Sequence, residues 1–143
     1  MDWSGHWHGY GPWIGTRDEY SKEYLRIPGA SPDDEQTRTF LANRIPPVMT
    51  GHALLRVAQT SPDRTWINAS SAIDWLKKTY ADHPPLGDYL PLEARVRYDE
   101  EFLPLGMDVI WAYYKRSTEL ISYSVICCPH RGFPDIPCPL PPS

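Results

Sequence analysis

Residues 108–128, DVIWAYYKRSTELISYSVICC, decide the fold, because they predict a β-hairpin. Two runs rich in β-branched and aromatic residues flank a polar break at residues 116–118, which is typical of two strands joined by a short loop. With those residues as the loop, one face is complementary throughout, with an opposite-charge pair at the loop end and aromatic and β-branched pairs beyond it. A slip of one residue would turn these side chains to the other face, so the pattern also predicts the register. The predicted pairs are Lys115–Glu119, Tyr113–Ile121, Trp111–Tyr123 and Val109–Val125.

The remainder of the chain predicts an α+β fold in which this hairpin belongs to a small antiparallel sheet. Residues 93–99, EARVRYD, alternate between apolar and charged side chains, which indicates a half-exposed third strand and a three-stranded meander. Residues 52–59, HALLRVAQ, fit a strand or a helix, and we favour a strand because the turn signal at residues 61–64 follows them. Residues 65–68 are a further candidate strand.

Two or three short helices are expected on this sheet. A capping box formed by Thr16 and Glu19 predicts a helix over residues 17–25, and Ser31 followed by Pro32 predicts another that reaches about residue 43. A third is expected over residues 72–81, where apolar side chains recur at helical spacing. This third helix is the one most suited to cover the sheet.

The two ends of the chain depart from regular structure. Residues 1–15 combine tryptophans with four glycines, so we expect an irregular arm carrying large anchors. Residues 129–143 contain six prolines, which favour an extended, polyproline-like tail. An arm with exposed tryptophans must pack on something, either its own domain or a partner. The candidate partner-binding residues are Trp3, Trp7, Tyr10 and Trp13.

Length and composition predict one domain and exclude several classes of function. A chain of 143 residues forms a single domain, and its net charge of −4 argues against binding to the nucleic-acid backbone. The longest apolar run is residues 120–128, too short to span a membrane, and the first residues do not resemble a secretory signal. Three cysteines, two of them adjacent, do not form a disulfide framework. We therefore expect a reduced, cytoplasmic protein.

Two groups of metal-ligating residues stand near the two ends. His6 and His8 would present both rings on one side if the arm were extended. Cys128, His130 and Cys138 form the second group. Cys127 is left out, because neighbouring strand residues point to opposite faces and this side chain falls on the apolar face. The two groups would form one site only if the arm lay beside the tail. We predict no cofactor, with zinc or another transition metal as the alternative.

No catalytic set of residues can be identified from the sequence. The glycines of the first fifteen residues do not form a phosphate-binding loop. Cys128 and His130 are near each other in the sequence, but no family signature of a thiol nucleophile surrounds them. We therefore favour a non-catalytic binding or assembly module, which docks on a protein partner or a second copy through the aromatic arm and the proline-rich tail. The alternative is a small enzyme with an aromatic-walled pocket, dependent on a metal held by the histidines and cysteines.

Overall fold

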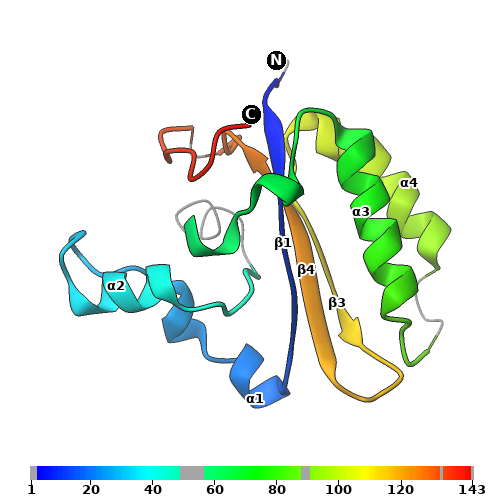
Figure 1. The fold of residues 1–143 in the computed structure, drawn as a ribbon, viewed down its shortest axis with the longest axis horizontal. Coiled ribbons are helices and arrows are strands. Elements are labelled where there is room, and N and C mark those ends of the chain that lie inside the picture. Colours follow the sequence, from blue (N-terminus) through cyan, green and yellow to red (C-terminus); the bar gives the residue numbers. More distant parts are fainter. Residues whose placement is uncertain (1–2, 49–56, 88–90, 133, 143) are drawn as a thin grey trace.

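A computed structural model describes residues 3–48, 57–87, 91–132 and 134–142. It shows an α+β fold built on a four-stranded antiparallel sheet with the strand order β2-β1-β4-β3 (Figure 1). The strands are β1 (His6–Gly15), β2 (Thr65–Trp66), β3 (Val109–Tyr114) and β4 (Leu120–Cys128). The α-helices are α1 (Arg17–Tyr20), α2 (Glu35–Ala42), α3 (Ala69–Asp82) and α4 (Leu92–Phe102). Short 3-10 turns lie at Glu23–Arg26, Val57–Gln59, Pro62–Arg64 and Leu103–Leu105.

The predicted hairpin is confirmed together with its register. Strands β3 and β4 pair Val109 with Val125, Trp111 with Tyr123 and Tyr113 with Ile121. At the loop end, the backbone N–H of Lys115 donates to the carbonyl of Glu119 at 2.8 Å, and their side chains form an ion pair at 3.9 Å. The register follows from the sequence because both strands belong to one local segment.

The expectation of an irregular N-terminal arm is wrong, because residues 6–15 form the long strand β1 in the middle of the sheet. The glycines stand where the backbone needs them. A Cβ atom at Gly9 would lie 2.6 Å from the Trp66 ring, so glycine lets this ring pack over the strand. Gly11 has a φ of +97° at the point where the register with β4 shifts, a conformation that other residues rarely adopt.

The expected strand at residues 93–99 is also wrong, because this segment lies in helix α4. Leu92, Val96, Asp99 and Leu103 recur at helical spacing and are the side chains that turn inward. A short apolar alternation fits both periods, and glutamate, alanine and arginine favour the helix. A meander would place residues 93–99 beside β3, but β3 is an edge of the four-stranded sheet, and the third strand of the sheet is β1 on the far side of β4.

The other predicted elements are found with changed bounds. The helix expected over residues 72–81 is α3, which begins after the cap Asn68, and the one expected over 32–43 is the shorter α2. The helix expected over 17–25 is divided into α1, which has the predicted capping box, and a 3-10 turn. Within the candidate strand 52–59, residues 57–59 form a 3-10 turn and residues 52–56 lie outside the described residues. Residues 65–66 form β2, so the candidate strand 65–68 is confirmed in its first half.

The two faces of the sheet carry different side chains. Helices α3 and α4 cover one face, on the right in Figure 1, where the main core contains Trp7, Leu76, Trp111 and Tyr123. The opposite face presents a smaller cluster of Tyr10, Ile126 and Cys128, on which Ile136 and Cys138 of the tail pack. The first and last described parts of the chain meet at one end of the sheet (Figure 1). This meeting point positions the candidate site.

No helix among the described residues is both long and apolar enough to cross a membrane.

Candidate metal centre

Four side chains with metal-binding atoms meet where β1, β4 and the tail come together. His6 and His8 stand on β1, Cys128 ends β4, and Cys138 lies in the tail. One ligand atom from each residue lies within 4.8 Å of the other three. The antiparallel pairing of β1 with β4 produces this meeting, because His6 pairs with Cys128 and His8 points to the same face two residues later. The cluster could hold a zinc-like metal ion.

Three of the distances inside the cluster match the edges of a zinc tetrahedron. Bonds of about 2.0–2.1 Å to nitrogen and about 2.3 Å to sulfur separate two nitrogens by about 3.3 Å, and a nitrogen from a sulfur by about 3.6 Å. The Nε2 atoms of His6 and His8 are 3.2 Å apart. The Sγ atom of Cys138 lies 3.4 Å from Nε2 of His6 and 3.7 Å from Nε2 of His8. These three atoms are spaced as the ligands of one zinc ion would be.

A hydrogen-bond chain prepares His8 for this role. The hydroxyl of Thr65 donates to the carbonyl of Ser61 at 2.8 Å, so its oxygen accepts from Nδ1 of His8 at 3.1 Å. With its proton on Nδ1, His8 directs the lone pair of Nε2 into the cluster, which is how an outer partner orients a metal-binding histidine. Sequence reasoning missed Thr65, and its spacing from His8 in the chain gives no signal of this contact.

Burial shifts the pKa values of His6, His8 and Cys128. The pKa of His8 is lowered to about 4 by burial and then by neighbouring His6, and burial also lowers the pKa of His6. Both rings are therefore neutral at pH 7, as metal ligands must be. Burial, reinforced by the adjacent Cys138 thiol, raises the pKa of Cys128 to about 12. A metal ion that binds here must displace the proton of this thiol.

His130, the fifth candidate ligand, is not part of the cluster. Its Nδ1 accepts from the backbone N–H of Gly132 at 3.0 Å, and its Nε2 faces Oδ2 of the buried Asp108 at 3.7 Å. Both ring nitrogens are thus turned to other partners. Cys127 lies in the main core beneath the helices, which confirms the prediction that the adjacent cysteines face apart.

The four candidate partner-binding residues lie in different surroundings. Trp7 is buried in the main core, and Tyr10 is buried in the smaller cluster on the opposite face. Trp3 and Trp13 are partly buried. The indole N–H of Trp3 donates to the carbonyl of Pro129 at 2.9 Å, and the Trp13 ring packs on Tyr20. Binding of a partner by these residues stays a prediction.

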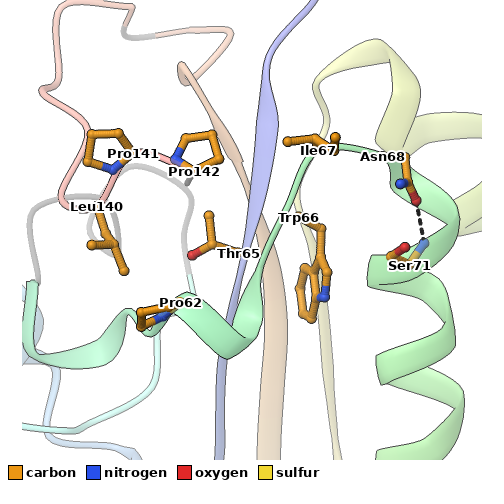
Figure 2. A pocket seen from close by; sticks show the side chains of 9 residues that line it. All are labelled: Pro62, Thr65, Trp66, Ile67, Asn68, Ser71, Leu140, Pro141 and Pro142. Carbon is orange, nitrogen blue, oxygen red and sulfur yellow. Dashed lines mark hydrogen bonds between the residues drawn. The ribbon is translucent and has the colours of Figure 1, made fainter.

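A pocket of about 280 Å³ lies beside the candidate metal centre, because Thr65 lines the pocket and contacts His8. Figure 2 shows Leu140, Pro141 and Pro142 of the tail on one side of this pocket, and Trp66, Ile67 and Asn68 on the other. Cys138 lies two residues before Leu140, so the segment that enters the cluster continues into one wall of the pocket.

A second pocket, of about 390 Å³, lies between α4 and the start of β3 and contains a buried carboxyl group. Its lining includes Tyr98, Asp99 and Trp111. Asp99 accepts from the indole N–H of Trp111 at 3.0 Å. Burial raises the pKa of Asp99 to about 7, although the indole and nearby Arg95 favour the carboxylate.

Because its pKa is raised, Asp99 should make the free energy of unfolding depend on pH, and Asp99→Asn should remove this contribution. The pKa of Asp99 is about 7 in the folded chain and near 3.8 once unfolded, so the folded chain binds more protons between these values. Its free energy of unfolding should therefore fall as the pH rises from about 4 to about 7.

Asparagine at position 99 keeps an oxygen that accepts from Trp111 but carries no charge. Urea unfolding should find the variant within about 1 kcal/mol of the parent at pH 4, and more stable by up to about 4 kcal/mol at pH 8. A difference that does not change with pH would contradict the raised pKa.

Comparisons of the chain with protein-family models, with curated proteins and with solved structures found no match.

Proposed function

We propose that this protein is a zinc-binding, non-catalytic module in which the metal ion fastens the proline-rich tail to the central sheet. The observation that carries the proposal is the set of distances among His6, His8 and Cys138, which match three edges of a zinc tetrahedron. Cys128, within 4.8 Å of these atoms, is the proposed fourth ligand. A ligand set of two histidines and two cysteines favours zinc over calcium or magnesium.

A structural role suits this site better than a catalytic one. Catalytic zinc usually has three protein ligands and an open position for water or substrate, whereas four protein ligands close the coordination sphere. Three of the ligands stand on paired strands, and the fourth stands in a segment without helix or strand. A metal ion here would therefore cross-link the described part of the tail to the sheet.

We place the docking role predicted from the sequence at the tail and not at the aromatic arm. Because Trp7 and Tyr10 are buried in the sheet, the aromatic arm offers less surface than its composition suggests. The pocket walled by Leu140, Pro141 and Pro142 is the surface that depends on the metal centre, and it combines Trp66 with stiff prolines. We propose that a protein partner docks at this pocket, with the zinc ion holding the wall in place.

The small-enzyme alternative rests on the pocket that contains Asp99. A carboxyl group whose pKa lies near 7 is suited to proton transfer, and Trp111 and Tyr98 supply the aromatic walls. The closed coordination of the metal centre gives this alternative no catalytic metal, so we place it second.

Metal analysis of purified protein tests the proposed function. We expect one zinc ion per chain after reconstitution, and a chelator should lower the melting temperature, because zinc at 100 times its dissociation constant adds about 2.7 kcal/mol, or roughly 5–10 °C for a chain of this size. His8→Ala and Cys138→Ser should each lose the ion. His130→Gln is the matched control and should keep it, because both nitrogens of this ring face other partners.

Two outcomes would contradict the proposal. The first is a purified protein that binds no transition metal under reducing conditions. The second is a metal that is retained by Cys138→Ser and lost from His130→Gln. Because Cys138 stands outside the helices and strands, its variant should fold, which separates loss of the metal from loss of the fold.

A further inference from the structure

The two sulfur atoms of the metal centre come from separate parts of the chain and lie close together. Cys128 ends strand β4, and Cys138 stands in the tail between two prolines. Their Sγ atoms belong to a cluster whose members lie within 4.8 Å of one another, and both thiols are free. A disulfide has an S–S bond of about 2.05 Å, so the two atoms would need to approach by less than about 3 Å. The irregular tail can make this movement without breaking a strand ladder.

The two cysteines differ in their access to solvent. Cys138 is half-buried, whereas the exposed fraction of Cys128 is 2%. A small oxidant that arrives from solvent therefore meets Cys138 first and finds Cys128 behind it. This arrangement is typical of a pair in which one cysteine is oxidised and the second resolves the product.

We propose that Cys128 and Cys138 form a redox modification site, at which a peroxide converts the zinc-binding thiolate pair into a disulfide and releases the metal ion. This inference rests on the proposed function. The Cys138 thiolate attacks the peroxide, the O–O bond breaks, and the sulfur becomes a sulfenic acid while hydroxide leaves. The Cys128 thiolate then attacks that sulfur, the S–O bond breaks, and a second hydroxide leaves. Overall, two thiolates are oxidised by two electrons, hydrogen peroxide is reduced, and two hydroxides take up protons to become water.

Metal release follows because a disulfide removes two of the four ligands. His6 and His8 alone would leave the zinc ion half-coordinated, and disulfide sulfur is a poor replacement for thiolate. The tail nevertheless stays attached, since the bond joins it to β4 at the same place. Oxidation would therefore exchange a metal cross-link for a covalent one.

The third cysteine supplies an internal control. Cys127 precedes Cys128 on β4, but its side chain is buried in the main core, with its sulfur 3.9 Å from the carbonyl of Leu103. Because the strand separates it from the tail, Cys127 cannot reach Cys138. The proposed disulfide is thus specific to one of two adjacent cysteines.

The test is to treat zinc-loaded protein with hydrogen peroxide while following three quantities: zinc captured by a coloured chelator, free thiols by titration, and linked peptides by mass spectrometry. We expect one zinc ion per chain to be released as two of the three thiols disappear, with a peptide linking Cys128 to Cys138. Dithiothreitol and added zinc should restore the starting state. Cys127→Ala should behave like the parent, and Cys138→Ser in metal-free form should give no linked peptide. The melting temperature of the oxidised protein should no longer respond to a chelator.

The inference is overturned by zinc that remains bound while the thiols disappear, by a linkage through Cys127, or by oxidation of Cys138 to a sulfinic acid with no linked peptide. The zinc content before oxidation separates the two proposals. A chain that never binds zinc contradicts the proposed function, whereas a zinc-loaded chain that forms no Cys128–Cys138 disulfide contradicts this inference alone.

Discussion

Deletion of residues 1–15 is expected to abolish cooperative unfolding, because it removes strand β1 from the middle of the sheet. This strand pairs with β4 along most of its length and with β2 on its other side. Without it, the edge of β4 would be unpaired, and the core would lose Trp7 while the opposite face would lose Tyr10. Urea unfolding followed by circular dichroism should show a gradual transition in place of a sigmoidal one.

A truncation at the other end provides the control for this deletion. Removing residues 139–143 leaves all four candidate ligands and the four described strands β1, β2, β3 and β4 in place. We expect this variant to unfold cooperatively and to keep its zinc, although it loses one wall of the pocket beside the metal centre. If the chain without residues 1–15 unfolds as sharply as this control, the position of β1 in the sheet is wrong.

The second large effect is expected from Trp111→Ala, which should lower the free energy of unfolding by about 3–5 kcal/mol. The exposed fraction of this side chain is 3%, and its ring packs against Tyr80 and Tyr123 at centroid distances of 5.9 Å. The variant also leaves the buried carboxyl group of Asp99 without the indole donor and removes the ring beneath Arg95. Chemical denaturation measures the loss.

Tyr114→Ala is the matched comparison for this substitution. Tyr114 stands on the same strand but on the opposite face, and its exposed fraction is 38%. Its replacement should cost only about 1 kcal/mol. Equal losses in the two variants would mean that the face covered by α3 and α4 is not the principal core.

The parts of the fold that the sequence predicts are those determined by neighbouring residues. The hairpin of β3 and β4, the capping box of α1 and the helical spacing of α3 each depend on a short segment, and each is confirmed. Strand β1 could not be predicted in the same way, because its glycines oppose a strand by propensity. They are explained by distant contacts, such as the Trp66 ring that packs over Gly9. Alternation of His6, His8 and Tyr10 with Trp7 was the local signal that could have indicated a strand.

The candidate site shows the same division between local and distant determinants. The side-chain period of a strand places His6 and His8 on the same face and turns Cys127 and Cys128 to opposite faces. Joining the histidines to Cys128 and Cys138 requires β1 to pair with β4, which no short segment determines. The exclusion of His130 depends on Asp108 and the Gly132 N–H, and the orientation of His8 depends on Thr65. These contacts form only in the folded chain, so they could not be predicted from the sequence.

Zinc K-edge X-ray absorption of the reconstituted, reduced protein tests the central claim most directly, because it measures the atoms around the ion. The proposed site predicts one zinc ion per chain with two nitrogen neighbours at about 2.0–2.1 Å and two sulfur neighbours at about 2.3 Å. The Cys138→Ser chain, if it retains any zinc, should show a single sulfur neighbour. A spectrum with oxygen and nitrogen neighbours only, or a chain that takes up no zinc, would contradict the claim that these four residues form a metal centre.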